Sequence, residues 1–335
     1  MDIKKQYKGL ISCIIIAIPC HYIGKIFPVI GGPVLAILSG MIIGGFIRDK
    51  DIFSSLAPGI KFTSKYILQL AVVLLGFGMN LNSVLLTGKE SLPIIVSTIS
   101  IALIISFILY KTMGMPPKIS TLIGVGSSIC GGSAIAATAP VIDAEEDEIA
   151  QAISVIFLFN VLAALIFPSL GGMIGFSDNG FGIFAGTAVN DTSSVTAAAS
   201  AWDGIHGSNT LDTAAIVKMT RTLAIIPITV GLALYRSRNS ESKSKMNLVK
   251  VFPVFILFFV LASVITTFAN LPPELVTFLK SASKFFIVMA MAGIGINTDL
   301  IKLVKTGAKP ILMGACCWIA IALTSIGMQY ILGLM

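Results

Sequence analysis

The chain has 335 residues, of which 56% are hydrophobic and only 12% are charged, and its mean hydropathy is +0.95. Because soluble domains carry about 25% charged residues, this composition excludes an ordinary soluble enzyme. The net charge of +7 comes from short basic runs between apolar segments, without the basic stripe and interleaved aromatic residues that mark nucleic-acid binding. The sequence therefore predicts an all-α polytopic membrane protein with no nucleic-acid partner.

Apolar stretches long enough to cross roughly 30 Å of hydrocarbon predict eleven transmembrane helices in chain order. They cover residues 9–27, 30–47, 63–86, 91–110, 119–142, 150–174, 180–201, 212–235, 250–270, 280–303 and 308–334. No small-residue cleavage pattern follows the first stretch, so it is expected to be a retained helix and not a signal peptide. We expect one integral membrane domain over residues 1–335.

The distribution of Lys and Arg predicts the orientation. With the N-terminus in the cytoplasm, seventeen of the 23 basic residues fall on the cytoplasmic side and four on the other side, which also holds the acidic loop 143–148. Cytoplasmic loops of membrane proteins carry such an excess. The pattern predicts a cytoplasmic N-terminus and an external C-terminus. The remaining two basic residues, Lys218 and Arg221, fall inside the eighth predicted span.

A short motif of two glycines, an asparagine and a later proline recurs in the chain. It comprises Gly76, Gly78, Asn80 and Pro93 in one copy and Gly293, Gly295, Asn297 and Pro310 in the other. The two copies lie in segments 63–110 and 280–334, which begin at the third and the tenth predicted span. Because these spans are seven apart, an odd number, the two segments would have opposite orientations in the membrane. Such inverted repeats are typical of secondary transporters. The alternative is a coincidence in a chain with 31 glycines that serve close helix packing.

Two predicted spans, 119–142 and 180–201, are expected to be broken helices. The first contains Gly131 and Gly132 among further glycines and serines, and the second contains Asn190 and Asp191 before an Ala-rich stretch. Each would direct a half-helix N-terminus, with free N–H groups and a positive dipole end, into the protein. That arrangement favours an anion site. The alternative is a small-residue surface for close helix packing.

Lys218 and Arg221 would lie about 9 Å and 13.5 Å deep if their helix begins near Asp212 and rises 1.5 Å per residue. A charge at that depth costs about 2.5 to 3.5 kcal/mol on insertion scales, so both require a partner or a wet cavity. One interpretation is a structural ion pair with Asp191. Because one carboxylate cannot neutralise two cations, the other interpretation is a bound anion such as an oxyanion, with Arg221 offering bidentate contacts.

The candidate substrate-binding residues come from the two broken helices and the intramembrane cations. They are Ser127, Ser128, Cys130, Gly131, Gly132, Ser133, Asn190, Asp191, Thr192, Ser193, Lys218 and Arg221. Candidate ion-coupling residues are Asn80, Asp191 and Asn297. Asn160 is expected to bridge helices and not to bind a ligand. No metal or cofactor is expected. No catalytic residue is expected either, because no histidine lies at membrane depth to activate Ser128 or Cys130.

Four motifs together resemble a known family. They are GSSICGGSAIA from Gly126, GTAVNDTSSV from Gly186, VKMTR over 217–221 and GIGINTDL from Gly293. They resemble the YeiH family of bacterial inner-membrane proteins, described as candidate sulfate exporters. The resemblance implies a fold similar to those of bile-acid sodium symporters and cation/proton antiporters, in which 119–142 and 180–201 would be the crossing broken helices.

The sequence and the resemblance together predict a secondary transporter of a small anion, such as sulfate or an organic sulfonate, in the bacterial inner membrane. One alternative is a cation/proton antiporter that uses Asp191. Another is a membrane receptor or structural protein that does not transport. The expected partners are the lipid bilayer and the small anion, while coupling to Na+ or H+ and homodimer formation are left open.

Overall fold

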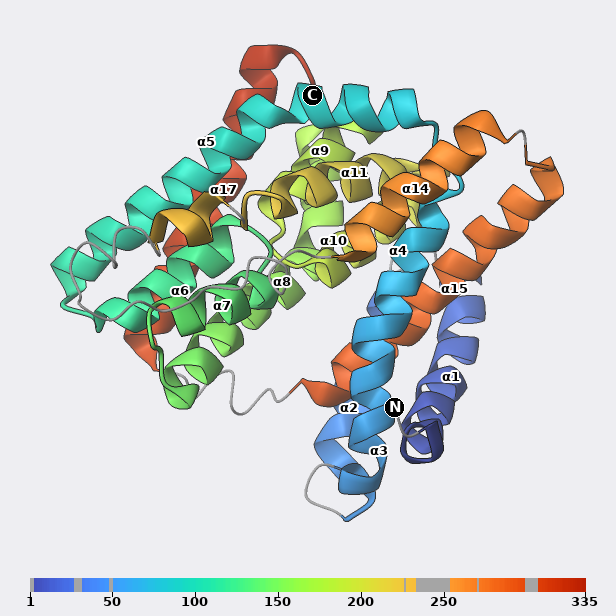
Figure 1. Ribbon diagram of the computed structural model, residues 1–335, viewed down its shortest axis with the longest axis horizontal. Helices are drawn as coiled ribbons and strands as arrows, with labels where there is room; N and C mark the ends of the chain where they lie inside the picture. Colours follow the sequence, from blue (N-terminus) through green and yellow to red (C-terminus); the bar gives the residue numbers. More distant parts are fainter. Residues whose placement is uncertain are drawn as a thin grey trace. The chain divides into compact units, whose positions relative to one another are not determined.

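The computed structural model describes residues 3–26, 32–47, 51–225, 227–232, 254–269, 271–298 and 307–335, and every regular element in these ranges is helical (Figure 1). The helices are α1 (Ile3–Ile26), α2 (Gly32–Ile47), α3 (Asp51–Phe62), α4 (Leu68–Gly76), α5 (Leu81–Met113), α6 (Pro117–Ser128), α7 (Gly132–Thr138), α8 (Glu146–Ile174), α9 (Asp178–Ala188), α10 (Thr192–His206), α11 (Thr210–Thr222), α14 (Val254–Phe268), α15 (Pro273–Asn297) and α17 (Ala308–Leu332). A π-helical segment, Thr63–Ile67, joins α3 to α4. The prediction of an all-α protein is confirmed.

Seven helices in the described residues are long and apolar enough to cross a membrane. They are Gln6–Gly24, Ile52–Gly76, Leu81–Met113, Asp147–Ile174, Thr210–Leu232, Pro273–Asn297 and Ala308–Leu332. The other four predicted spans coincide with the shorter helices α2 and α14 and with two interrupted pairs, α6–α7 and α9–α10. The protein is thus a multi-pass helical membrane protein.

The chain divides into two compact units, which are described separately. Unit 1 comprises Met1–Leu86, Thr196–Asp212 and Val254–Ile301, and unit 2 comprises Thr87–Val195, Thr213–Pro253 and Lys302–Met335. In unit 1, α2 packs along α15 (Figure 1). A Cβ added at Gly40 would lie 2.5 Å from the Ala292 carbonyl oxygen, so only glycine permits this close helix approach, as in small-residue packing between membrane helices.

The third predicted span, 63–86, is not one continuous helix. Helix α4 ends at Gly76, and α5 begins only at Leu81 after a turn. A Cβ added at Gly76 would lie 2.5 Å from the carbonyl oxygen of Phe259 in α14. The motif glycine therefore permits α14 to pack closely at the point where α4 stops.

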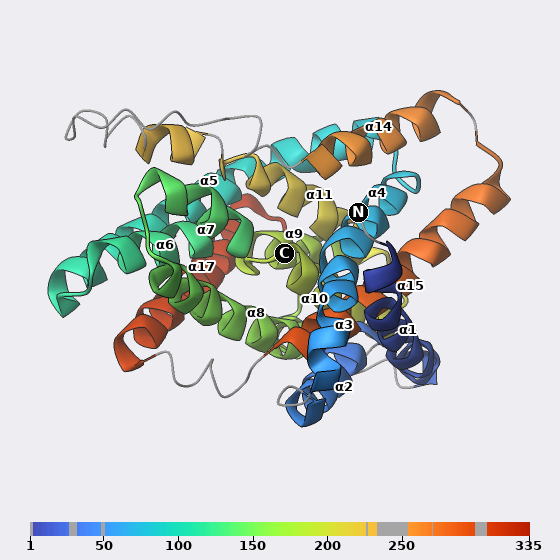
Figure 2. The same ribbon diagram turned by 60° about the horizontal axis from the view of Figure 1, so that its bottom comes forward.

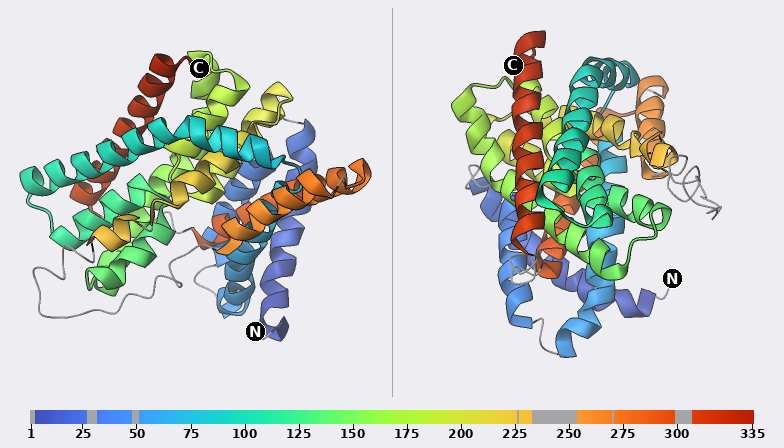
Figure 3. Two further views of the ribbon diagram at one scale, coloured as in Figure 1. Left: turned by 45° about the horizontal axis from the view of Figure 1, so that its top comes forward. Right: turned by 90° about the vertical axis from the view of Figure 1, so that its left-hand side faces the viewer.

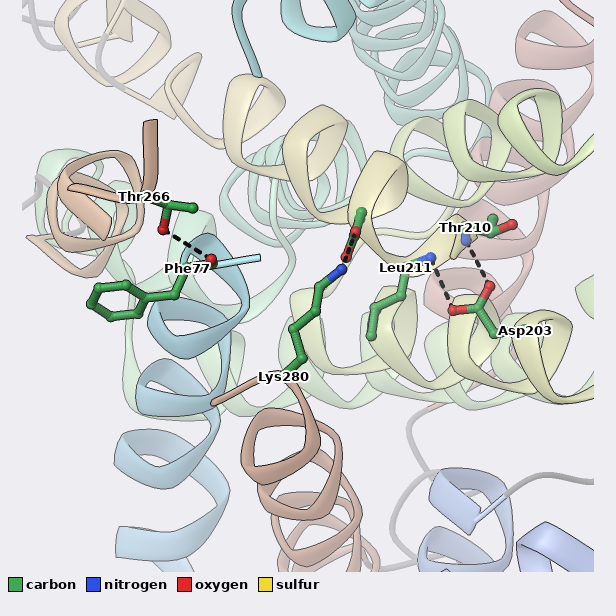
Figure 4. Close-up of polar contacts among 7 residues, drawn as sticks. Phe77, Asp203, Thr210, Leu211, Thr266 and Lys280 are labelled. Atoms are coloured by element: carbon green, nitrogen blue, oxygen red, sulfur yellow. Dashed lines mark hydrogen bonds and ion pairs between the residues drawn. The ribbon is translucent and has the colours of Figure 1, made fainter. Parts of the chain in front are cut away.

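Threonine side chains of α14 supply hydrogen bonds at this turn. The Thr266 hydroxyl donates to the Phe77 carbonyl oxygen at 2.9 Å (Figure 4), and the Leu81 N–H donates to the Thr267 hydroxyl oxygen at 2.9 Å. Because backbone groups at a helix end lack partners within the helix, these two side chains stabilise an interruption that the apolar composition of the span does not indicate.

In unit 2, α6 and α7 are separate helical pieces beside α8 (Figure 2). One buried apolar cluster joins Leu122 of α6 and Ile135 of α7 to Ile156 and Phe159 of α8. Helix α17 contributes Met313 and Cys317 to the same cluster. Helix α17 is a single uninterrupted helix (Figure 3) that packs against α6, α8 and α9. The continuous helix α8 thus packs against α6 and α7, and the continuous helix α17 packs against α6 and α9.

Candidate functional site

The first interruption separates α6 from α7. Helix α6 stops at Ser128, Ile129 leaves helical geometry with φ −120° and ψ −90°, and Gly131 adopts φ 67° and ψ −125°. A positive φ with this ψ is accessible to glycine and strained for residues that carry a Cβ. The turn leaves the last carbonyl groups of α6 without the N–H partners that a continuing helix would provide.

The second interruption separates α9 from α10. Helix α9 ends at Ala188, and Val189 is extended, with φ −94° and ψ 131°. At the start of α10, one carboxylate oxygen of Asp191 accepts a hydrogen bond from the Ser193 N–H at 3.0 Å and another from the Ser193 hydroxyl. Asp191 is therefore the N-cap of α10, and the chain's own carboxylate occupies a position that the sequence analysis assigned to a bound anion.

Both interruptions meet at Lys218, which α11 carries and which is completely buried. Its ammonium donates to the carbonyl oxygens of Ile129 at 2.8 Å and Val189 at 3.1 Å, and also to the carbonyl oxygen of Asn190. The first acceptor belongs to the end of α6, and the other two follow α9. The three N–H donors of the ammonium are thus directed at three backbone carbonyls.

Arg221, one turn further along α11, is also completely buried. Its Nε donates to the Ser128 carbonyl oxygen at 2.9 Å, Nη2 to that of Ser127 at 2.8 Å, and Nη1 to that of Val189 at 3.3 Å. Nη2 also lies 3.4 Å from the amide oxygen of Asn190. The planar guanidinium therefore joins the end of α6 to the end of α9, as a rigid fork of donors permits.

The carbonyl acceptors are the part of the site that sequence reasoning missed. It considered the N-terminal ends of the half-helices, whereas the cations bind the C-terminal ends, where unpaired carbonyls and the negative dipole end attract positive charge. In the described part of the chain, no ion pair links Asp191 to Lys218 or Arg221. The sequence could have indicated these acceptors, because every broken helix exposes carbonyl groups as well as N–H groups.

The remaining candidates of the first interruption differ in accessibility. The Ser128 hydroxyl donates to the Val125 carbonyl oxygen at 3.0 Å, and the buried Cys130 sulfur accepts a hydrogen bond from the Ala134 N–H. Gly132 begins α7, while the Ser133 side chain is exposed. Helix α7 has only seven residues, so its dipole is shorter than the sequence analysis assumed.

The two interruptions are in contact at Gly131. A Cβ added there would lie 3.5 Å from Asp191 Cβ and 3.6 Å from the amide nitrogen of Asn160. Asn160 of α8 is buried, and its side-chain oxygen accepts a hydrogen bond from the Asn190 N–H at 3.1 Å. Thr192, the first residue of α10, is half-buried. Asn160 thus bridges α8 to the second interruption.

The candidate ion-coupling residues come from both units, and the two asparagines of unit 1 lie apart. Asp191 belongs to unit 2, and Asn80 and Asn297 belong to unit 1. Asn80 precedes α5 close to Gly78, whose added Cβ would overlap the Lys280 side chain. Lys280 and Asn297 are 17 residues apart on α15, which corresponds to about 25 Å along the helix. Asn80 and Asn297 therefore lie toward opposite ends of α15.

Unit 1 holds a polar cluster that the sequence analysis did not identify (Figure 4). Lys280 forms an ion pair with Asp212 at 3.0 Å. The Asp203 carboxylate accepts hydrogen bonds from the Thr210 N–H at 2.6 Å and the Leu211 N–H at 3.3 Å, and so caps α11. Asp203 lies beyond the predicted span 180–201, and burial raises the pKa of its carboxyl group above the ordinary value of 3.8.

Comparison with known proteins identifies close relatives of the whole chain. Residues 8–314 match a family model described as conserved hypothetical protein 698. A UPF0324 membrane protein from Streptococcus agalactiae is 60% identical, with 99% of each chain covered. Similar proteins from Streptococcus mutans, 59% identical with both chains covered completely, and Fusobacterium nucleatum, 57% identical with 97% of this chain and 98% of the relative covered, carry the same description.

Proposed function

Because the chain belongs to the UPF0324 membrane protein family, the family of conserved hypothetical protein 698, we propose that it is a secondary transporter of a small anion in the bacterial inner membrane. One observation carries the proposal: two interrupted helices of unit 2 end at two completely buried cations. Interrupted helices with ends directed at substrate and coupling ions are a recurring construction of secondary transporters. Buried intramembrane charges are costly and mark functional sites.

The proposed topology has eleven crossings, with a cytoplasmic N-terminus and an external C-terminus. Seven would be the long helices, two would be α2 and α14, and two would be the interrupted pairs α6–α7 and α9–α10. In this proposal, segments 63–110 and 280–334 are inverted repeats, and the fold is similar to those of bile-acid sodium symporters and cation/proton antiporters. The seventeen basic residues on one side support the orientation.

The charge balance of the site favours an anionic substrate. Lys218 and Arg221 contribute two positive charges, and Asp191 contributes one negative charge. The C-terminal ends of α6 and α9 and the N-terminal ends of α7 and α10 carry opposite partial charges that roughly cancel. The remainder is about one positive charge in a low-dielectric environment, where an uncompensated charge is costly. A monovalent anion would neutralise it, so an organic sulfonate fits better than divalent sulfate.

The accessible groups beside the site suit such an anion. Ser133 is exposed and Thr192 is half-buried, and they lie in the first turns of the helices that follow the two interruptions. The cations donate hydrogen bonds to carbonyl oxygens, so they would attract the anion by their charge, and the two hydroxyls would contact it directly. The proposed role is transport and not catalysis, and the hydrogen bond of the Ser128 hydroxyl within its own helix supports a structural role for that side chain.

The test is flux into proteoliposomes that contain the purified protein. We expect saturable uptake of a radiolabelled monovalent sulfonate, with a lower rate for labelled sulfate. A Lys218→Ala, Arg221→Ala double variant should lose uptake, whereas Lys111→Ala, which removes an exposed cation near the end of α5, should retain it. Equal uptake by the double variant and the wild type would refute the assignment of the site.

A cation/proton antiporter is the second candidate, because Asp191 is the carboxylate that lies where the two interruptions touch. It requires the carboxylate to exchange its proton for a cation during the cycle. Asp191→Asn keeps an oxygen for the Ser193 N–H and removes the titratable group. Cation flux driven by a pH gradient that disappears in Asp191→Asn would favour antiport, and flux that the substitution leaves unchanged would exclude it.

A further inference from the structure

The carbonyl oxygens around Lys218 form the kind of site that usually binds a free metal cation. Three of them, from Ile129, Val189 and Asn190, converge on one nitrogen from two different helix interruptions. In secondary transporters, unwound backbone carbonyls and the C-terminal ends of half-helices coordinate Na+. The oxygens here have the same origin, but a covalently attached ammonium binds to them.

Arg221 completes this arrangement from the same helix. It binds the carbonyl oxygens of Ser127 and Ser128, which immediately precede the first acceptor of Lys218, and it shares the Val189 carbonyl with that residue. The two cations lie three positions apart and therefore share one face of α11. Together they engage five consecutive or neighbouring carbonyls at the ends of α6 and α9.

We propose that Lys218 and Arg221 are resident cations that fill the cation site formed by the ends of α6 and α9, so that the wild-type protein binds no Na+ there and removal of the Lys218 side chain opens a site for a free monovalent cation. The inference goes beyond the proposed function, because it concerns cation binding and holds whether or not an anion is transported.

The chemistry of the opened site follows from what the substitution removes. In Lys218→Ala, the buried carbonyl oxygens of Ile129 and Asn190 lose their donor, and the Val189 carbonyl keeps only the longer bond from Arg221 at 3.3 Å. Unpaired buried carbonyls are costly, so a cation that enters the space is stabilised. The atoms removed beyond Cβ correspond to propylammonium, which fits both the oxygens and the space of the side-chain stem. Na+ fits the oxygens only.

The test is thermal unfolding of the purified full-length protein in detergent, at constant ionic strength. The salts are choline chloride as reference, sodium chloride and propylammonium chloride. The wild type should unfold at the same temperature in all three. Lys218→Ala should unfold at a lower temperature in choline chloride and regain about 3 to 5 °C when propylammonium is present at ten times its Kd. Sodium should give a smaller gain.

Two controls make the result specific. Lys111→Ala removes an exposed cation of α5 and should show no response to propylammonium. Lys218→Met fills the space with an apolar chain and should show none either. If Lys218→Ala can be purified only when propylammonium is present throughout, that dependence supports the proposal as well.

Several outcomes would overturn the proposal. Saturable stabilisation of the wild type by Na+ that Lys218→Ala abolishes would mean that a free cation binds beside the lysine. A Lys218→Ala protein that neither salt stabilises would mean that no cation site is present. Neither readout depends on a transported substrate, so a failure of the flux assay leaves this test unaffected.

Discussion

The backbone at Gly131 gives the sharpest test of how the two interruptions are built. With φ 67° and ψ −125°, alanine at this position would hold a strained conformation that costs about 1 to 3 kcal/mol. Its Cβ would also lie 3.3 Å from Cγ2 of the buried Ile156 and 3.5 Å from Asp191 Cβ. Gly131→Ala should therefore destabilise the protein and displace the end of the first interruption from the second.

The adjacent Gly132 is a matched control. It begins α7 in helical geometry, and a Cβ added there would meet no atom within 4 Å. Because alanine is favoured over glycine in helices by up to about 1 kcal/mol, Gly132→Ala should be neutral or slightly stabilising. The two variants have the same composition, so differences in hydrophobicity cannot explain a divergence between them.

The assay is thermal unfolding in detergent, combined with the anion uptake described above. At about 2 to 4 °C per kcal/mol for a chain somewhat smaller than this one, Gly131→Ala should unfold several degrees below the wild type and take up anion more slowly. Gly132→Ala should retain both properties. If the two variants are equally stable, the turn at this point does not require glycine. The arrangement of carbonyl groups that binds the cations would then be refuted as well.

Three further predictions test other contacts. Arg221→Met removes the donor from the buried carbonyls of Ser127 and Ser128 and should cost about 1 to 3 kcal/mol for each, measured as a lower unfolding temperature. Lys111→Met loses an exposed cation 5.3 Å from the Phe107 ring centre and should cost less than about 1 kcal/mol. Equal costs would exclude anchoring through Arg221. Asp191→Ala should lose about 1 kcal/mol of helix capping and Asp191→Asn only part of it, so equal unfolding temperatures for the wild type and both variants would exclude the N-cap. Burial raises the pKa of Asp203 above 3.8, so the folded state binds the proton of this carboxyl group more tightly than the unfolded state does. The resulting contribution to the free energy of unfolding is present at low pH and is lost as pH rises through the folded-state pKa. The wild type should therefore gain stability relative to Asp203→Asn as pH falls from 7 toward 4, and a gap that is independent of pH would contradict the shift.

The long apolar helices follow directly from composition, but the interruption between α4 and α5 does not. Residues 70–79 contain no polar side chain, and hydropathy alone continues the span past Gly76. The helix ends there because Phe259 of α14 approaches the glycine backbone and because Thr266 and Thr267 of the same helix supply hydrogen bonds at the turn. These contacts link residues about 180 positions apart in sequence, so no local pattern contains them.

The short helices show a related limit of hydropathy. Helix α14 has 15 residues and α2 has 16, and residues 30–31, 250–253 and 270 of the corresponding predicted spans lie outside the described residues. At 1.5 Å per residue, 15 residues cover about 22 Å, which is less than roughly 30 Å of hydrocarbon. Composition thus locates such a helix but does not by itself give its length.

Within the site, the sequence locates the residues but leaves their pairing open. The depth of Lys218 and Arg221 requires partners, and Asp191 is the conspicuous opposite charge nearby in the chain. The carbonyl groups of Ser127, Ser128, Ile129, Val189 and Asn190 carry no side-chain signal, because every residue type has one. Only the geometry of the two interruptions determines which carbonyls are left without helical partners and where they point.

The direction of the half-helix ends also explains why the cations and the carboxylate do not pair. A broken helix has two ends of opposite polarity at one place, so it attracts a cation to the preceding half and an anion to the following half. Lys218 and Arg221 bind the carbonyl ends of α6 and α9, and Asp191 caps the N–H end of α10. The two cations, the carboxylate and the four helix ends together leave an excess of about one positive charge, and α7 is the following half-helix whose N–H end has no side-chain cap. A substrate anion that neutralises this excess would therefore be expected to contact the exposed Ser133 side before it reaches Thr192. Replacing Ser133 by alanine should consequently raise the KM for uptake more than the same change at Thr192, and equal effects would place the anion elsewhere.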